Sequence, residues 1–372
     1  MKNEDFSHFS PIDLLDRLIA TPSISREEGA TAQLLIDFLT AQGVSDVQRL
    51  MNNVWVRCAT WDDNKPTLLL NAHHDTVKPN PAYTRNPFEP THEDGRIYGL
   101  GSNDDGASLV SLIATFQHFY HQELPFNLLL ALTAEEEVTG MNGARALIPF
   151  LISHFSLPTS HLMAIVGEPT RMHAAIAERG LMVLDGVATG KAGHAARNEG
   201  VNALYIALDD IQTLRNYRFE KESELLGPIK VTTTMISAGT QHNVVPAECR
   251  FVVDVRTTDV YTNEEVAALL QQDVQSTLTP RSTHIRASAI DRSHPLVQTA
   301  EKLGIPLFIS PTTSDQSQMP FPSIKMGPGD SARSHTADEW VGEQEIYDAI
   351  ETYTAFIKSL TFSPSPRGAA GI

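Results

Sequence analysis

Apolar residues along the first half of the chain follow two alternating patterns. Continuous apolar runs of strand length cover residues 67–72, 128–134 and 162–167, and stretches with apolar residues at helical spacing, such as 107–121 and 143–154, lie between them. Fully apolar strands are typical of a sheet that is covered on both faces. Strands that alternate with helices predict a parallel α/β sheet, which we expect for this region.

The pattern changes near residue 180. Long runs rich in valine, threonine and isoleucine at 181–189, 229–237 and 251–256 predict strands, and helical stripes at 202–216 and 263–274 lie between them. This order is typical of a ferredoxin-like α+β sandwich, β-α-β-β-α-β. The α/β pattern resumes near residue 296, so the sandwich is predicted to be an insertion.

A chain of 372 residues is too long for one ordinary core, which favours two domains. The change of pattern places residues 1–178 and 291–372 in one discontinuous domain and residues 179–290 in the inserted one. Hydrophobic residues make up 41% of the chain and charged residues 20%, as in folded globular proteins and unlike disordered ones.

The net charge and the cysteine content indicate which binding partners and which cellular compartment to expect. The formal net charge of −17 argues against nucleic acid or an anionic membrane surface as a partner. Two cysteines, Cys58 and Cys249, are too few for a disulfide framework and fit a reducing compartment. Residues 1–6 lack the apolar segment of a signal peptide, and no apolar run approaches the ~20 residues that span a bilayer. We therefore expect a cytoplasmic protein with no nucleic-acid or membrane partner.

Each of the three apolar strands ends in side chains that can bind a metal. The first runs into His73-His74-Asp75, the second into Glu135-Glu136-Glu137 and the third into Glu168. Ligands of open α/β sheets bind beyond the carboxyl ends of the strands, so these side chains are predicted to share one crevice. Three carboxylates near a core repel one another unless a cation lies between them. A solvated acidic turn is the alternative for residues 135–137 alone, but the positions at successive strand ends favour a metal site.

Two further candidates come from polar loops: Asp104 ends a glycine-rich segment that begins at Gly99, and His335 follows Gly327-Pro-Gly. Zinc binds histidine and carboxylate ligands, and two-metal hydrolytic sites hold their ions about 3.5–4 Å apart. Two histidines and three carboxylates are enough for two Zn²⁺ ions that share one carboxylate, and Co²⁺ suits the same ligands. The five candidates are His73, Asp104, Glu137, Glu168 and His335.

These residues stand in five motifs: His-x-Asp-x-Val at 73–77, the glycine-rich segment at 99–104, the paired glutamates at 136–137, Gly-Glu-Pro-Thr at 167–170 and the last histidine at 335. With these motifs in this order, the chain resembles the M20 metallopeptidase/deacylase family over essentially its whole length. The resemblance implies a mostly parallel-sheet di-zinc hydrolase domain with an inserted ferredoxin-like dimerisation domain. It implies that His73, Asp104 and Glu168 hold one zinc ion. Asp104, Glu137 and His335 would hold the other.

The resemblance also implies the roles of residues that do not bind metal. Asp75 would orient His73 by accepting its other ring proton, and Glu136 would be the general base. His194, in Gly190-Lys-Ala-Gly-His194, matches a histidine that reaches the active site of the partner subunit in a homodimer and stabilises the oxyanion. Three further residues resemble positions that contact the carboxylate of the substrate, and these are Arg179, Asn243 and Arg256.

The chain departs from the family in two places. Asp105-Gly106 stands where many members carry a lysine after the bridging aspartate, and His74 stands where many carry a small residue. His74 is therefore an alternative ligand to His73, although side-chain alternation along a strand would point it elsewhere. The roles of His74, Asp105 and Glu135 stay open from the sequence.

Within the family the chain is most similar to acetylornithine deacetylases. This resemblance implies a zinc-dependent deacylase that converts N-acetylornithine to ornithine and acetate in arginine biosynthesis. The alternatives are a desuccinylase acting on succinylornithine or succinyl-diaminopimelate, and an M20 di- or tripeptidase. A two-lobed protein that binds a small molecule without catalysis is the alternative from another class, and the carboxylates at the strand ends argue against it.

Overall fold

The computed structural model of the chain describes residues 10–197 and 199–361. The chain forms two compact units. The second unit comprises Ala177–Ala289 and Ile309–Thr313, and the remainder of the chain forms the first. The sequence places the insertion at 179–290 and gives no sign that the short segment 309–313 belongs with it.

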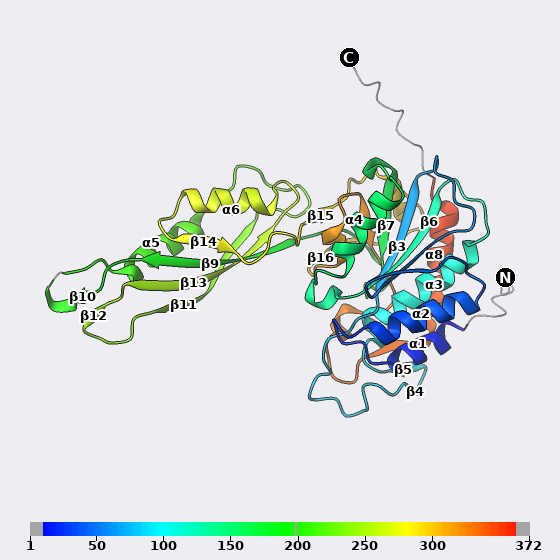
Figure 1. The fold of residues 1–372 in the computed structure, drawn as a ribbon. Coiled ribbons are helices and arrows are strands. Elements are labelled where there is room, and N and C mark those ends of the chain that lie inside the picture. Colours follow the sequence, from blue (N-terminus) through cyan, green and yellow to red (C-terminus); the bar gives the residue numbers. More distant parts are fainter. Residues whose placement is uncertain (1–9, 198, 362–372) are drawn as a thin grey trace, which may run out of the picture. The chain divides into compact units, whose positions relative to one another are not determined.

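The first unit is built on a mixed sheet with the strand order β1-β2-β6-β3-β7-β17-β8, and β16 also pairs with β8 (Figure 1). Strand β15, whose two residues belong to the second unit, pairs with Ala177 and Glu178 at the end of β8, which belong to that unit too. The strands are β1 (Gln48–Leu50), β2 (Asn53–Arg57), β3 (Thr67–His73), β6 (Asn127–Thr133), β7 (Leu162–Val166), β8 (Ala174–Glu178), β15 (Ser288–Ala289), β16 (Leu307–Ser310) and β17 (Ser323–Lys325). The central strands are parallel: β3 pairs with β6 and β7, and β17 pairs with β7. The predicted α/β fold class is confirmed.

Helices cover both faces of this sheet, which explains why every residue of β3 and β6 is buried. On one face α3 packs against β3 and α8, and α1 packs against α3. On the other face Leu147 and Leu151 of α4 join a core cluster with Leu69 and Leu129. The helices of this unit are α1 (Pro11–Ile19), α2 (Gly29–Ala41), α3 (Ala107–Phe119), α4 (Ala144–His154), α7 (Pro295–Lys302) and α8 (Glu343–Ser359).

Short elements beside the sheet position the loops that carry the candidate ligands. Three short strands pair in the order β18-β5-β4. They are β4 (Thr91–Glu93), β5 (Arg96–Tyr98) and β18 (Trp340–Gly342). The single helical turns of the unit are η1 (Ser102–Gly106), η2 (Glu136–Val138), η3 (Thr159–His161), η5 (Asp315–Gln318) and η6 (Ser331–Arg333). Asp104 lies in η1, and Glu136 and Glu137 open η2.

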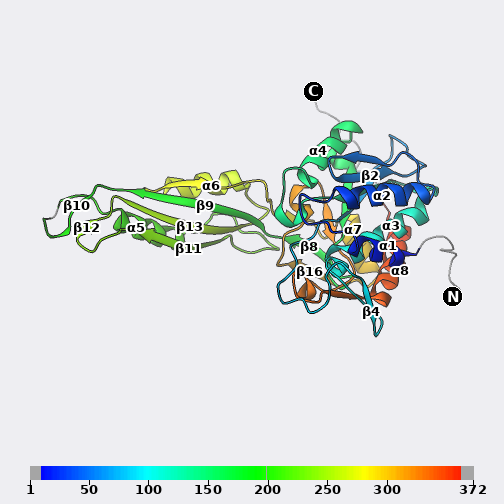
Figure 2. The same cartoon turned by 60° about the horizontal axis from the view of Figure 1, so that its bottom comes forward.

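The second unit is an antiparallel sheet with the strand order β11-β13-β9-β14 and two helices (Figure 2). Its elements are β9 (Gly180–Thr189), β10 (Gly193–His194), η4 (Ala195–Arg197), α5 (Ala203–Asn216), β11 (Lys230–Ala238), β12 (Val244–Val245), β13 (Glu248–Thr257), α6 (Asn263–Gln272) and β14 (Thr277–Pro280). The order of the main elements is the predicted β-α-β-β-α-β. Buried residues alternate along β9 and β13, because the helices cover one face of the sheet only.

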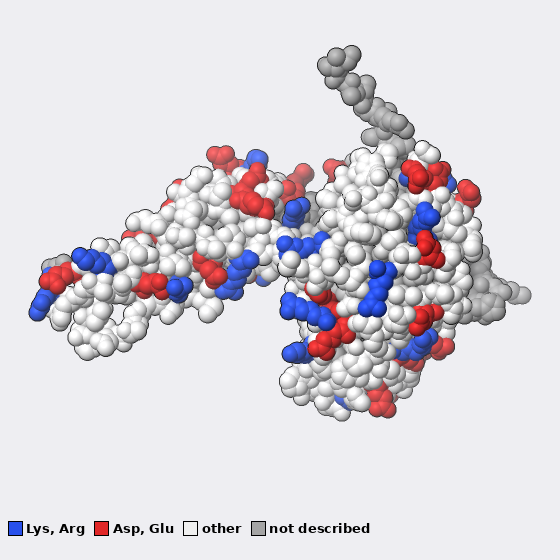
Figure 3. Space-filling model, in the orientation of Figure 1, with Lys and Arg blue, Asp and Glu red and all other residues white. Residues whose placement is uncertain are grey.

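The side of the surface drawn in Figure 3 carries charges of both signs. On the side drawn in Figure 3, the side chains of lysine and arginine lie interspersed with those of aspartate and glutamate. Among the described residues, no helix combines the length and the apolar composition that crossing a bilayer requires.

Candidate active site

The site is organised around His73, the last residue of the buried strand β3. Its Nδ1 lies 3.0 Å from the backbone oxygen of Asp75 and 3.5 Å from the Asp75 Oδ1 atom. On the other side of the ring, Nε2 lies 3.2 Å from Asp104 Oδ1 and 4.0 Å from Glu136 Oε2. The ring is thus fixed through one nitrogen, and the second nitrogen faces the carboxylates.

Asp104 links the two histidines of the predicted site. Its Oδ1 faces His73, and its Oδ2 lies 3.7 Å from Nε2 of His335. The same Nε2 atom of His335 lies 2.9 Å from Glu137 Oε2. A carboxylate whose two oxygens face two different histidines has the arrangement of a shared ligand between two metal ions.

The described residues contain two groups in which one ligand atom per residue lies within 4.8 Å of the others. His73, Asp104 and Glu137 form one group, and His73, Glu136 and Glu168 form the other. With His335 against Glu137, all five predicted ligands meet at one place. Glu136 and Glu137 are neighbours in sequence but face different groups, so distance alone does not distinguish the general base from the ligands.

Asp75 positions the turn at residues 136–137 as well as the ring of His73. Its Oδ1 accepts the backbone N–H of Glu136 at 3.0 Å, and its Oδ2 accepts that of Glu137 at 3.2 Å. The hydroxyl of Ser25 donates to Oδ2 at 2.7 Å. One buried carboxylate therefore positions both the imidazole and the turn that carries the two glutamates.

The sequence Ser25-Arg-Glu-Glu28 has the form of a capping box and predicts that it opens a helix; a helix does follow, but the predicted cap is wrong. Helix α2 begins at Gly29 without a side-chain cap. Ser25 donates to Asp75 instead, and the carboxylate of Glu28 accepts the Asn52 amide at 2.8 Å and the backbone N–H of Glu135 at 3.3 Å. Tertiary partners near the site replace the local cap. The supporting role of Ser25 and Glu28 is not visible in the sequence.

Two residues whose roles were open are structural. The ring of His74 is buried, with Nδ1 2.9 Å from the Thr31 hydroxyl and Nε2 2.9 Å from the backbone oxygen of Asn52, so both nitrogens are occupied away from the carboxylates. The carboxylate of Glu135 accepts the backbone N–H of Asn142 at 3.2 Å and its side-chain amide at 2.8 Å. Glu135 therefore closes the turn that follows the strand.

Burial of several carboxylates makes the site electrostatically unfavourable without a cation. Burial raises the pKa of Glu136 well above its usual range, and the charges of Glu168 and Asp315 raise it further. Burial likewise raises the pKa of Glu168, although the charge of buried Lys325 opposes the shift. Burial lowers the pKa of His73, but hydrogen bonds with Asp104 and Asp75 outweigh this and raise it well above its usual value. A divalent cation would stabilise the ionised carboxylates.

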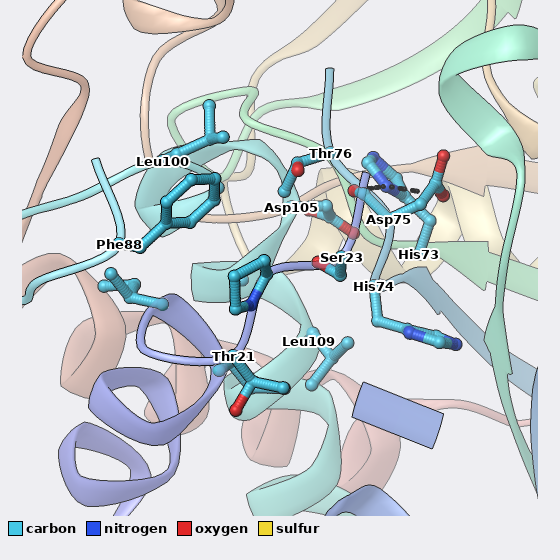
Figure 4. Close-up of a pocket in the computed structure, with 15 residues that line it drawn as sticks. Thr21, Ser23, His73, His74, Asp75, Thr76, Phe88, Leu100, Asp105 and Leu109 are labelled. Carbon is cyan, nitrogen blue, oxygen red and sulfur yellow. Dashed lines mark hydrogen bonds and ion pairs between the residues drawn. The ribbon is translucent and has the colours of Figure 1, made fainter. Parts of the chain in front are cut away.

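A small cavity lies beside His73 and Asp75 (Figure 4). It has a volume of about 20 Å³, and the side chains of Thr76, Asp105 and Leu109 are among those that line it. This volume is room for about one water molecule, so the cavity is not a substrate pocket. Asp105 is buried where it lines this cavity, and burial raises the pKa of its carboxyl group to about 8.

The remaining candidate residues lie in the second unit. His194 pairs with Val244 in the two-stranded sheet of β10 and β12, and the backbone oxygen of Asn243 accepts the N–H of Ala195 at 3.0 Å, so the segments that carry His194 and Asn243 lie side by side. The N–H of Ala196 donates to His194 Nδ1 at 3.2 Å. In a neutral ring the proton is then on Nε2.

The two arginines have partners within their own unit. Arg179 donates to the backbone oxygens of Leu226 and Pro228. Arg256 forms a two-bond ion pair with Asp254, at 2.9 and 3.2 Å. Their predicted contact with a substrate carboxylate stays a prediction.

Comparisons with known proteins agree with this geometry. The sequence pattern of peptidase family M20/M25/M40 matches residues 69–359. An acetylornithine deacetylase from Edwardsiella ictaluri is 29% identical over 93% of this chain and 96% of its own length. A succinyl-diaminopimelate desuccinylase from Paracoccus denitrificans is 30% identical over 70% of this chain and 71% of its own length.

Solved structures share the fold at lower identity. The aminopeptidase PepT from Bacillus cereus superposes with a TM-score of 0.71 at 19% identity, over 94% of this chain and 98% of its own. A Bacillus subtilis protein described as a dinuclear metal binding peptidase of the M20 family superposes with a TM-score of 0.69 at 16% identity, over 94% and 97%. The family match covers most of the chain, and the carboxylate-rich site is of the kind that such hydrolases need. The prediction of an enzyme is confirmed: the chain belongs to peptidase family M20/M25/M40 and is a metal-dependent hydrolase of amide bonds.

Proposed function

We propose that the protein removes the acyl group from an N-acyl amino acid, with N-acetylornithine as the substrate, in the cytoplasm and in arginine biosynthesis. The observation that carries the hydrolytic part is the position of Asp104, whose two oxygens face His73 and His335. The choice of acetylornithine is supported by the extent of the similarity: two acetylornithine deacetylases match 93% and 89% of this chain, whereas the desuccinylases from Paracoccus denitrificans and Delftia acidovorans match 70% and 72%.

The donor set fits two Zn²⁺ ions, because imidazole nitrogen and carboxylate oxygen are the ligands that zinc binds. We assign His73, Asp104 and Glu168 to one ion and Asp104, Glu137 and His335 to the other. When bound, the ions would polarise the scissile carbonyl and lower the pKa of a water molecule towards ~7.

Glu136 is the residue that we assign to proton transfer. It follows the buried strand β6 in a turn that Asp75 holds, and its side chain lies beside His73 and Glu168. A positioned carboxylate next to the ligands can take a proton from the attacking water and pass it to the leaving amine. Asp75 keeps both this turn and the ring of His73 in place.

The second unit supplies the remaining roles of the proposal. His194 presents its Nε2 proton as a hydrogen-bond donor for the oxyanion, because Nδ1 already accepts the N–H of Ala196. We assign Asn243, Arg256 and Arg179 to the carboxylate of the substrate. In the substrate complex the two arginines would then exchange their present partners within the second unit for the carboxylate of the substrate.

We further propose that the protein is a homodimer that forms through the second unit. Strand β11 lies at an edge of its sheet, and its Met235 and Ile236 side chains are exposed, as are Tyr205 and Leu208 of α5. Exposed apolar side chains on an edge strand and a neighbouring helix mark an interaction surface. Sedimentation of the purified protein is expected to give twice the mass of the 40.8 kDa chain, and a mass of one chain would exclude the dimer.

A substrate panel tests the assignment of the acyl group. The zinc-loaded protein is offered acetylornithine, succinylornithine, succinyl-diaminopimelate and a set of dipeptides. We expect the highest kcat/KM for acetylornithine, by about tenfold or more, which corresponds to about 1.4 kcal/mol of differential transition-state binding. A preference for a succinylated substrate would mean that the acyl group is succinyl and not acetyl. A preference for dipeptides would contradict the assignment to arginine biosynthesis.

A further inference from the structure

The carboxylate of Glu339 is buried next to the site, although Glu339 belongs to none of the motifs described above. It is 2% exposed and lies four residues after His335. Its Oε1 accepts the backbone N–H groups of Asn103 at 3.0 Å and Asp104 at 2.8 Å, and its Oε2 accepts that of Gly101 at 3.2 Å. Three backbone donors on one carboxylate fix the conformation of the loop that carries Asp104.

The same contacts join two distant segments of the chain. The backbone oxygen of Glu339 also accepts the N–H of Gly99 at 3.0 Å, and the side chain of Asn103 is bonded to the backbone of Asp330 in both directions, at 2.9 and 3.2 Å. The loop at 99–104 is therefore held by the segment 330–339, which also carries His335. His73 and Glu168 are positioned by the central sheet instead, because His73 is the last residue of the buried strand β3 and Glu168 comes two residues after the buried strand β7.

We infer that Glu339 is a positioning residue that sets the distance between Asp104 and His335, and thereby the affinity for the metal ion that these two residues share with Glu137. This inference rests on the proposed assignment of the ligands. Residues that hold metal ligands in place typically contribute 10–100-fold to metal affinity. We expect a contribution of this size for one ion and a smaller one for the ion assigned to His73 and Glu168.

The test is a titration of the metal-free protein with Co²⁺. Calorimetry measures the affinity of each binding step, and the visible absorption of bound cobalt reports its ligand environment. The variant Glu339→Gln retains one oxygen for Asn103 and Asp104, but its amide group faces the N–H of Gly101, where two donors cannot bond. We expect one of the two binding steps to weaken by about 10–100-fold, with a changed cobalt spectrum for that step. The variant Glu339→Asp retains the charge on a shorter side chain, and its loss is expected to be smaller.

The second unit offers a matched control in Asp210. Its carboxylate is 3% exposed and accepts three hydrogen bonds, from the N–H of Gln275 at 3.0 Å and from the N–H and hydroxyl of Ser276 at 2.7 and 2.5 Å. The variant Asp210→Asn therefore loses comparable bonds far from the ligands in sequence. It is expected to lower the melting temperature and to leave both cobalt-binding steps unchanged.

The outcomes separate this inference from the proposed function. If the parent protein binds two cobalt ions and Glu339→Gln binds both with parental affinity and spectrum, the inference is wrong and the ligand assignment stands. Equal weakening of both steps, or the same weakening in Asp210→Asn, would also contradict it, because Glu339 would then act through general stability. A parent protein that binds no cobalt would overturn the proposed function and the inference together.

Discussion

The variant Glu136→Gln is expected to lose hydrolysis while it keeps its metal. Glutamine has nearly the size and shape of glutamate but cannot take a proton from the attacking water. General acid–base catalysis by a positioned side chain contributes about 10²–10⁴-fold, so kcat should fall by that factor. Metal content should stay at the parental value, because the assigned ligands are unchanged. Initial rates with acetylornithine and metal analysis of the same sample measure both quantities.

A control for the loss of one carboxylate is Glu123→Gln. Glu123 is an exposed residue whose Oε2 lies 3.4 Å from Nζ of Lys65, and the change is expected to leave kcat at the parental value. Parental kcat in Glu136→Gln would exclude Glu136 as the general base. Loss of metal together with loss of activity would instead place Glu136 among the ligands, in the group with His73 and Glu168.

The variant Asp75→Asn is expected to affect both the metal and the chemistry. Asp75 holds the ring of His73 and accepts the N–H groups of both Glu136 and Glu137. An asparagine can accept at one of its two positions only, so at least one of the two glutamates loses its support. We expect zinc affinity to fall by about 10–100-fold, and kcat to remain below the parental value even when zinc is saturating.

The variant Ser25→Ala is a milder change at the same carboxylate, and its effect on zinc affinity is compared with that of Asp75→Asn. It removes one neutral donor to Asp75 and leaves the bonds to the glutamate turn in place. A hydrogen bond to a charged group contributes about 1.5–3 kcal/mol to stability, but the bonds from Asp75 to the glutamate turn remain, so the effect on zinc affinity should be below that of Asp75→Asn. Equal effects of the two substitutions would mean that the turn does not depend on the Asp75 carboxylate.

The parts of the fold that the sequence predicts well are those with a strong hydrophobic pattern. The strands β3 and β6 are fully apolar because helices cover both faces, and β9 and β13 alternate because only one face is covered. The ferredoxin-like pattern implies a strand after the second helix, but the position of β14 (Thr277–Pro280) was not identified, because four residues are too few to show a period. The segment 309–313 joins the second unit through tertiary contacts that leave no pattern in the sequence.

The sequence likewise predicts some residues of the site and not others. Candidate ligands that follow apolar strands can be found in the sequence, because the topology of an α/β sheet gathers strand ends. Glu28 and Glu339 could not be found, because their partners are backbone N–H groups and an amide distant in sequence. At residues 25–28 a valid local pattern gave a wrong prediction, since the hydrogen bond from Ser25 to Asp75 replaces the cap.

The central claim is that five side chains, distant in sequence, hold two divalent ions with Asp104 between them. The most direct measurement is the zinc content of the purified protein after zinc loading and removal of excess metal, for the parent and for Asp104→Ala. The account predicts two zinc ions per parent chain and loss of both from the variant at low micromolar free zinc. A parent chain that retains no zinc, or a variant that still retains two, would contradict it.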